Sequence, residues 1–335
     1  MENKAPEFVQ ILEKMFVPAS ERFLKLMGMI INQEEARLLL AMPGQPADLA
    51  RKRGLPLDGT EEMIRVLYFK GLAFPSPKTD PPTWRMGRDF VQLHDATILW
   101  PDAPQAFLDQ WQDIMETEWP EMAKNFSALM PRPFTRVIPV GVAVQADTQV
   151  LAYENVHEII EQAKTLAVTK CTCRLTAHKC DRPLESCLQV NRAAQYSIDR
   201  GTGREVSKEE ALKILREAEE AGLIHVTMNK HQVDHFICNC CPCCCQTLPI
   251  LIKGGIRVID PSRFQARVDP DQCTACGACL ERCYFGALQG EEEGRVQVEG
   301  EKCIGCGLCR VVCPVEAITL EVVRPEEFVP EKYFL

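Results

Sequence analysis

The sequence predicts a multidomain chain that mixes helices and strands (α+β), and three observations lead to this expectation. The chain has 335 residues, which is enough for two or three separate cores. Helix and strand patterns alternate along it. All 18 cysteines lie after residue 170, so the two halves differ in kind. We therefore expect a helical N-terminal domain over 1–134, a cysteine-rich α/β domain over 135–262 and a third domain over 263–335.

The N-terminal domain is expected to begin with three short helices. Asn32 and Glu35 make a capping pattern in front of an apolar stretch, which predicts the first helix. A second helix is predicted over 46–53, and a third starts near Asp58. Gly71 ends the third helix, because glycine is the usual residue after a helix C-terminus.

A β hairpin is expected next, with a strand that contains Trp84, Met86 and Phe90 after a proline-rich loop. Three short helices followed by a hairpin resemble the winged-helix family in pattern. Lys and Arg only balance Asp and Glu over residues 34–95, and the chain carries a net charge of -9. Because neutralised phosphates supply most of the affinity for nucleic acid, these charges favour a protein-packing module over a DNA-binding one.

Further elements are expected between the hairpin and the last cysteines. An amphipathic segment over 104–129 is expected to pack the N-terminal domain against the next. A strand is predicted over 137–144 and a helix from about Glu154. Another helix starts at Ser207, and a strand over 223–229 leads into the second cysteine block.

The sharpest motif is a repeat near the end of the chain. Two copies of C-x2-C-x2-C-x3-C are present, Cys273, Cys276, Cys279 and Cys283, then Cys303, Cys306, Cys309 and Cys313. Four closely spaced thiolates are what a 4Fe-4S cube needs, and the small residues between them let the backbone wrap closely. Paired zinc sites are the alternative, but their C-x2-C pairs are separated by longer loops. The repeat therefore predicts two 4Fe-4S clusters.

Residues 266–322 resemble bacterial-type two-cluster ferredoxins. The resemblance implies a β-α-β domain in which the fourth cysteine of each copy binds the cluster of the other copy. One cluster would then be held by Cys273, Cys276, Cys279 and Cys313, and the other by Cys303, Cys306, Cys309 and Cys283. One departure is visible, because Pro314 follows Cys313 as in the family, whereas Tyr284 follows Cys283. This departure bears on the potential and solvent access of that site.

Ten more cysteines form two blocks in the central domain. They are Cys171, Cys173, Cys180 and Cys187, then Cys238, Cys240, Cys241, Cys243, Cys244 and Cys245. Four thiols of the first block could close one cluster alone. The six of the second exceed the four corners of a cube, so they must serve two sites or leave free thiols. Nearby Arg174 and Arg182 favour a negatively charged cluster.

Three alternatives remain open for these ten thiols. Two cubes could form with ligands exchanged between the blocks, or one atypical cluster could use five or six thiolates or keep an open iron. Zinc at thiolate-only sites is the third alternative. The whole pattern from about Val137 onward resembles a group of 4Fe-4S dicluster proteins of anaerobes, some with a winged-helix-like N-terminal part. Heterodisulfide reductases have a similar run, but here Pro242 follows the Cys240-Cys241 pair.

Composition excludes several other classes of protein. The chain has no apolar run long enough for a membrane span and no secretion signal, so we expect it in the cytoplasm. Cysteines at metal-ligand spacing in a reducing compartment favour bound iron over disulfides. No nucleotide-binding fingerprint is present. The acidic run at 291–293 is a candidate docking surface for a basic partner.

The motifs together predict electron transfer. We expect the ferredoxin clusters to exchange electrons with a redox partner protein, or within a larger redox complex, and to relay them to or from the central site. One alternative is an oxidoreductase that reduces a disulfide or a small substrate at an atypical central cluster. Another is a redox-sensing winged-helix regulator.

Overall fold

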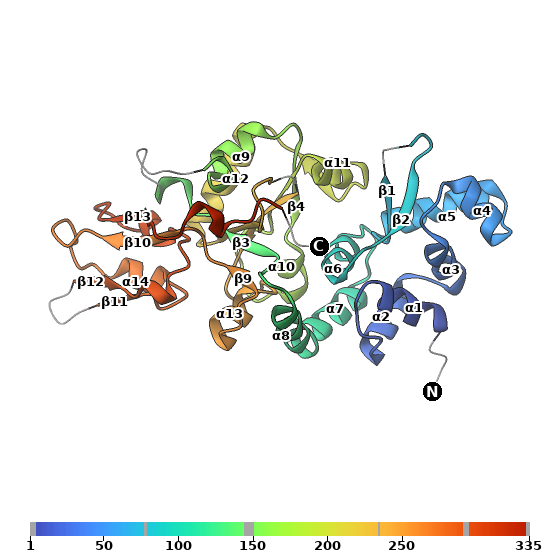
Figure 1. Ribbon diagram of the computed structural model, residues 1–335, viewed down its shortest axis with the longest axis horizontal. Coiled ribbons are helices and arrows are strands. Elements are labelled where there is room, and N and C mark those ends of the chain that lie inside the picture. The colour runs from blue at the N-terminus through green and yellow to red at the C-terminus, as the bar shows by residue number, and fades with distance from the viewer. Residues whose placement is uncertain (1–4, 77–78, 144–150, 234, 291–294, 333–335) are drawn as a thin grey trace. The chain divides into compact units, whose positions relative to one another are not determined.

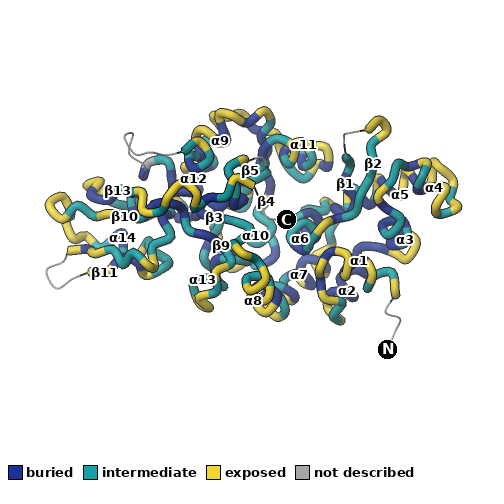
Figure 2. Tube along the Cα trace, in the orientation of Figure 1, coloured by how far each residue is buried: buried dark blue, intermediate teal, exposed yellow. Residues whose placement is uncertain are grey.

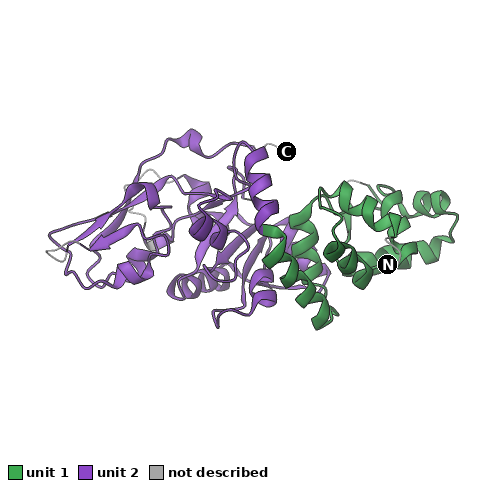
Figure 3. Cartoon of the chain, turned by 90° about the horizontal axis from the view of Figure 1, so that it is seen from below, with its two compact units in different colours: residues 1–119 green, residues 120–335 purple. Residues whose placement is uncertain are grey.

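The computed structural model describes residues 5–76, 79–143, 151–233, 235–290 and 295–332. This part of the chain mixes helices and short strands, as the sequence predicts (Figure 1). The chain divides into two compact units, residues 1–119 and 120–335 (Figure 3). The finer division at residues 134 and 262 stays a prediction. Among the described residues, no helix has the length and apolar content that crossing a membrane requires.

Unit 1 contains seven helices and one hairpin among its described residues. In chain order they are α1 (Pro6–Lys14), α2 (Glu21–Ile30), α3 (Gln33–Ala41), α4 (Pro46–Arg53), α5 (Leu57–Phe69), β1 (Ala73–Ser76), β2 (Thr83–Met86), α6 (Phe90–Ile98) and α7 (Gln105–Thr117). The three predicted helices before the hairpin are confirmed as α3, α4 and α5. Their assignment to the winged-helix family stays a prediction.

Local signals explain where these helices begin and end. The Asn32 side chain accepts a hydrogen bond from the Glu35 N–H at 2.9 Å, and the Glu35 carboxylate accepts one from the Asn32 N–H at 2.8 Å. This capping box starts α3, as predicted. Gly54 ends α4 with a φ of 67°, a left-handed conformation that glycine adopts without steric cost.

Two expectations for this region need correction. Phe90 does not lie in a strand, because the Asp89 side chain accepts the N–H of Gln92 at 2.8 Å and so starts α6 at Phe90. The amphipathic segment over 104–129 forms two helices, α7 and α8 (Trp119–Leu129), which Glu118 separates.

The core of unit 1 is built around Trp111, which is fully buried. The rings of Phe23 and Phe90 meet it edge to face, each with a centroid distance of 6.1 Å. The indole N–H of Trp111 donates to the Thr97 hydroxyl at 3.1 Å, and that hydroxyl donates to the Leu93 carbonyl at 2.7 Å. The largest buried side chain of the unit therefore has its one polar atom satisfied.

A seven-stranded sheet is the centre of unit 2. Its spatial order is β6 (Gly203–Glu205), β4 (Leu166–Lys170), β5 (Glu185–Val190), β8 (Phe236–Cys240), β7 (Ile224–Met228), β3 (Thr135–Val137) and β9 (Ile259–Asp260). Among the described strands of this sheet, only β3 and β9 pair in parallel. All of β7 is buried, and β4 is exposed only at its last residue (Figure 2).

Helices α9 (Val156–Gln162) and α12 (Lys208–Glu220) pack apolar side chains onto β4 and β5. Helix α12 begins as predicted, because the Ser207 hydroxyl accepts the N–H of Glu210 at 3.1 Å. The strand predicted over 223–229 is confirmed as β7. The strand predicted over 137–144 is wrong beyond Val137, because a short 3-10 turn follows at Gly141–Ala143. Val144 lies outside the described residues.

The last part of unit 2 consists of two antiparallel strand pairs and two short helices (Figure 1). Strand β10 (Phe264–Val268) pairs with β13 (Ile318–Val322), and β11 (Leu288–Gly290) pairs with β12 (Val296–Val298). Helices α14 (Ala278–Arg282) and α15 (Leu308–Val311) each follow one of the two cysteine loops. The acidic run at 291–293 lies outside the described residues.

The carboxyl end of α12 joins this part to the sheet. The carbonyls of residues 219 and 220 accept hydrogen bonds from Arg282, at 3.3 and 3.2 Å. The next carbonyl accepts from Arg182 at 3.0 Å, and the Gly222 carbonyl accepts from the Tyr284 hydroxyl at 3.0 Å. Helix carbonyls at this end have no partner within the helix, and cations stabilise them.

Gly222 is required at this junction. Its φ is +74°, and a Cβ atom there would come within 2.5 Å of the Tyr284 hydroxyl and 2.6 Å of Arg282 Nη1. A side chain at this position would therefore strain the backbone and also push away two of the groups that cap α12.

Replacing Thr97 with Val tests the polar contact in the core of unit 1. Val has nearly the same shape but no hydroxyl, so the buried Trp111 N–H loses its acceptor, and we expect a loss of about 1–3 kcal/mol in the free energy of unfolding. Urea unfolding followed by tryptophan fluorescence measures it. Thr97→Ser, which keeps the hydroxyl, is the control, and an equal or larger loss in Ser would contradict this account.

Replacing Gly222 with Ala tests the α12 junction. Gly201 is the matched control, because its φ is +68° and a Cβ there would meet nothing within 4 Å. Both variants carry the left-handed backbone strain of about 1–2 kcal/mol. We expect Gly222→Ala to lower the thermal unfolding midpoint of unit 2 further than Gly201→Ala, at one scan rate. Equal shifts would mean that the contacts of Tyr284 and Arg282 contribute nothing to stability.

Candidate metal centres

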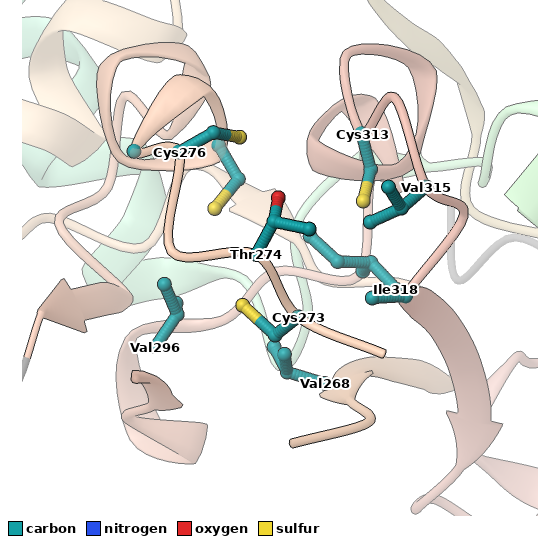
Figure 4. Close-up of a pocket in the computed structure, with 11 residues that line it drawn as sticks. Val268, Cys273, Thr274, Cys276, Val296, Cys313, Val315 and Ile318 are labelled. Carbon is teal, nitrogen blue, oxygen red and sulfur yellow. The ribbon is translucent and has the colours of Figure 1, made fainter. Parts of the chain in front are cut away.

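One group of thiols lines a pocket in the last part of unit 2. Cys273, Cys276 and Cys279 come from the first loop and α14, and Cys313 comes from the turn after α15. Figure 4 shows the labelled sulfur atoms around the same space. Apolar side chains, among them Val296 and Ile318, complete the lining. The structure thus brings together one of the two sets that the ferredoxin resemblance implies.

The second group is formed by Cys303, Cys306, Cys309 and Cys283. Burial, together with the neighbouring Cys303 and Cys283, raises the pKa of Cys306 to about 12. Burial also raises the pKa of Cys309, with added effects from the other three thiols. Backbone N–H groups donate to two of the sulfurs, to Cys303 at 3.5 Å and to Cys283 at 3.4 Å. Thiols that interact with one another in a largely buried site favour a bound cation over four protonated side chains.

The two loops share their backbone conformation. Gly277 and Gly307, at equivalent places in the repeat, have φ values of 76° and 77° and stand before α14 and α15. Ala275 and Gly305, also equivalent, have φ values of 55° and 67°. The two copies of the sequence motif therefore have the same backbone conformation, in which each loop wraps around its cysteine side chains.

Four central thiols form a compact group, here called the four-thiol set. It consists of Cys180, Cys241, Cys243 and Cys244, whose sulfur atoms all lie within 4.8 Å of one another. Cys180 lies 4.0 Å from Cys241 and 3.7 Å from Cys244, and Cys243 lies 3.8 Å from Cys244. Cys180 belongs to the loop between α10 (Thr172–Ala177) and β5, and the other three belong to the turn after β8.

The other six central thiols form a row, here called the six-thiol row. Neighbours along it interact side chain to side chain, in the order Cys171, Cys173, Cys245, Cys240, Cys238 and Cys187. The Cys187 and Cys238 sulfurs are 3.7 Å apart. Hydrogen bonds from Cys173 and Cys240 hold the pKa of Cys245 well below its usual range. The hydrogen bond with Cys173 lowers the pKa of Cys171 as well. Metals bind deprotonated thiols, so these contacts favour metal ligation.

The two sequence blocks therefore do not correspond to the two spatial groups. Cys180 leaves the first block and joins three cysteines of the second, so the first block does not close a site alone. The second block divides between the groups, because Cys238 and Cys240 alternate with Asn239 along β8, whereas Cys241 begins the turn. Both blocks contribute to both groups.

Arg174 is a buried cation between the two groups, with 2% of its surface exposed. Burial lowers its pKa, but Cys171 and Cys240 of the six-thiol row and Cys241 and Cys180 of the four-thiol set raise it. Its guanidinium donates to the Ser186 hydroxyl at 2.8 Å and to the Asn239 carbonyl at 3.0 Å. A buried cation bound to neutral acceptors requires an anionic neighbour, which metal-bound thiolates supply.

Arg182 connects the four-thiol set to the C-terminal part. Its Nη1 lies 3.6 Å from the Cys243 sulfur, and its Nη2 lies 3.3 Å from the Tyr284 hydroxyl. Tyr284 is the residue that replaces the family's proline after Cys283. Tyr284, the residue that departs from the motif, therefore connects the C-terminal part to the four-thiol set through Arg182.

Sequence reasoning missed a buried polar chain on the other face of β8. His225 lies between Glu219, at 3.0 Å, and the Asn239 side chain, at 2.5 Å. Histidine and glutamate are both almost fully buried. The one signal in the sequence was an asparagine inside a run of cysteines, which is unusual for a strand that only packs. The polar chain and two thiols of the six-thiol row, Cys238 and Cys240, thus lie on opposite faces of one strand.

Comparisons with known proteins agree with the geometry of the last part of the chain. Residues 266–320 match a family model described as a 4Fe-4S dicluster domain. A ferredoxin from Pyrobaculum islandicum is 39% identical over 52 residues, which are 16% of this chain and 49% of that ferredoxin. The chain thus spans about half the length of that curated relative. Its C-terminal part is a 4Fe-4S ferredoxin-like domain, as the sequence resemblance implied.

Proposed function

We propose that this protein transfers electrons between a redox partner protein and its own six-thiol row, through two 4Fe-4S clusters in the ferredoxin-like domain. The observation that carries the proposal is the six-thiol row, which lies in the same compact unit as a 4Fe-4S dicluster domain. Clusters of that kind transfer one electron at a time. A carrier that only shuttled electrons would need no more than the C-terminal eight cysteines. The six-thiol row supplies a place for these electrons to go.

We assign the first cluster to Cys273, Cys276, Cys279 and Cys313, and the second to Cys303, Cys306, Cys309 and Cys283. The pocket supports the first assignment, and the mutual effects on pKa support the second. The clusters supply the redox chemistry. The protein contributes the thiolates, the N–H groups that donate to Cys303 and Cys283, and a largely buried setting, all of which tune reduction potentials.

We place a further iron–sulfur centre on the six-thiol row. Six interacting thiols exceed the four corners of one cube, so they suit a larger or open cluster better than a closed cube. The buried Arg174 favours a negatively charged centre there. Cysteines at metal-ligand spacing suit a reducing compartment, and for this reason we propose the cytoplasm.

A second candidate function is reduction of a disulfide or small substrate at the six-thiol row. The His225–Glu219 pair favours it, because cleaving a disulfide to two thiols consumes two electrons and two protons. Two clusters can deliver the electrons one at a time, and the histidine–glutamate pair, on the opposite face of β8 from Cys238 and Cys240, is a candidate proton source. In this case the protein is an iron–sulfur oxidoreductase or its electron-transfer subunit.

The regulatory alternative rests on the N-terminal unit. Helices α3 to α5 followed by the β1–β2 hairpin give the element order of a winged helix. Several basic residues of this region pair with acidic ones, for example Arg65 with Glu62 at 2.7 Å and Arg37 with Glu7 at 2.8 Å. Such pairing weakens the attraction to phosphate, so protein recognition suits this unit better.

Iron and sulfide analysis of the protein, isolated without oxygen, tests the proposal. We expect more than the eight irons of two cubes, because the six-thiol row adds its own. Replacing Cys238 and Cys240 together with Ser should lower the iron content to about eight and leave the EPR signals of the C-terminal clusters unchanged.

The matched control is Cys306→Ser, which should remove iron from the ferredoxin-like domain and leave the iron of the row in place. A wild-type protein with only about eight irons would contradict the third centre. An iron content below eight would contradict the pair of C-terminal cubes itself.

A further inference from the structure

The spacing of sulfur atoms in the four-thiol set matches a single metal ion. Three of its sulfur–sulfur distances are 3.7, 3.8 and 4.0 Å, and no pair exceeds 4.8 Å. Zinc binds thiolates at about 2.3 Å in a tetrahedron, and the edges of such a tetrahedron are about 3.8 Å long. One ion at the centre would therefore reach all four sulfurs with little movement.

The same spacing is too small for a 4Fe-4S cube. A cube puts each thiolate on a different iron, so its four sulfurs surround a larger body than one ion. The chain offers its own comparison, since the C-terminal thiols lie in a domain of the 4Fe-4S dicluster family. Within the described residues, which include all eight of them, no three of these thiols come as close together as the four-thiol set.

The set also has the closed character of a structural site. Four protein sulfurs fill a tetrahedron and leave no position for water or substrate, unlike catalytic zinc, which keeps one position open. Cys241 and Cys244 are 1% and 8% exposed. The set packs against Ala218 and Leu223 at the carboxyl end of α12. An ion there would tie the Cys180 loop and the turn after β8 to that helix end.

The charge balance is favourable as well. A divalent ion with four thiolates carries a net charge of about -2. Arg182 donates to the Cys243 sulfur at 3.6 Å, and Arg174 lies between this set and the six-thiol row, where it interacts with Cys241 and Cys180. Two cations are thus available to offset the charge, one half-buried and one buried.

We propose that Cys180, Cys241, Cys243 and Cys244 bind one zinc ion as a closed structural site, separate from the iron–sulfur clusters. Binding forms four zinc–sulfur bonds and releases the thiol protons to solvent, with no change of oxidation state. The site goes beyond the proposed electron transfer and does not depend on it. It assigns to the ten central thiols two different tasks, ligation of a structural ion by four and redox chemistry by six.

Metal analysis and zinc-edge X-ray absorption of the full chain test the proposal. The protein is isolated without oxygen from cells grown with excess iron, so that zinc is not bound for lack of iron. We expect about one zinc per chain, surrounded by four sulfur atoms at about 2.3 Å. A zinc content below about one fifth per chain, or replacement of zinc by iron as the iron supply rises, would overturn it.

Two serine variants assign the ion to its ligands. Cys243→Ser should lower the zinc content at least tenfold and leave the iron content unchanged. Cys238→Ser, in the six-thiol row, is the matched control and should leave zinc unchanged. Loss of iron from Cys243→Ser would mean that the four-thiol set holds iron and would overturn the zinc assignment.

The absorption spectrum of the wild-type protein decides the coordination even if a variant fails to fold. Nitrogen or oxygen neighbours in place of four sulfurs would overturn the site. The same samples report the iron content separately, so a failure of the electron-transfer proposal, with only about eight irons, is distinguishable from a failure of the zinc site.

Discussion

The carboxyl end of α12 is the constraint on which the arrangement of thiols in unit 2 depends. Its last carbonyls have no partner within the helix, and Arg282, Arg182 and Tyr284 supply the missing donors. One donor comes from the Cys180 loop and two come from the ferredoxin-like domain, so a single helix end fixes both. The four-thiol set packs against the same end. Gly222 is essential to this because its missing side chain leaves room for the donors.

The division of the central thiols follows from ordinary backbone geometry. Along β8 the side chains alternate, so Cys238 and Cys240 share a face and Asn239 takes the other. The turn that follows carries Cys241 away from that face. The positive charge of Arg174 separates the two groups, because its guanidinium lies between them and interacts with thiols of both. A run of cysteines that looks like one site in the sequence is therefore two sites in space.

Features set by residues close together in the sequence could be predicted, whereas contacts between distant residues could not. The capping box at Asn32 and the serine cap at Ser207 depend on residues three positions apart, so they were found. The ferredoxin repeat was found because its spacing alone encodes the loop. The partners of Cys180 lie 61 or more residues away, and no pattern in one sequence specifies that path. The prediction placed Phe90 in a strand because aromatic residues favour strands. The prediction was wrong because the Asp89 side chain caps a helix that begins at Phe90.

The tyrosine at position 284 gives a symmetric repeat two unlike sides. Cys276 of the first loop is exposed, whereas its equivalent in the second loop, Cys306, is half-buried. The Tyr284 hydroxyl, next in sequence to Cys283, donates to the Gly222 carbonyl and so joins one copy of the repeat to the rest of unit 2. The two copies of one motif thus differ in their surroundings. Two clusters held at the same ligand spacing would therefore differ in their access to solvent and to the other groups of the protein.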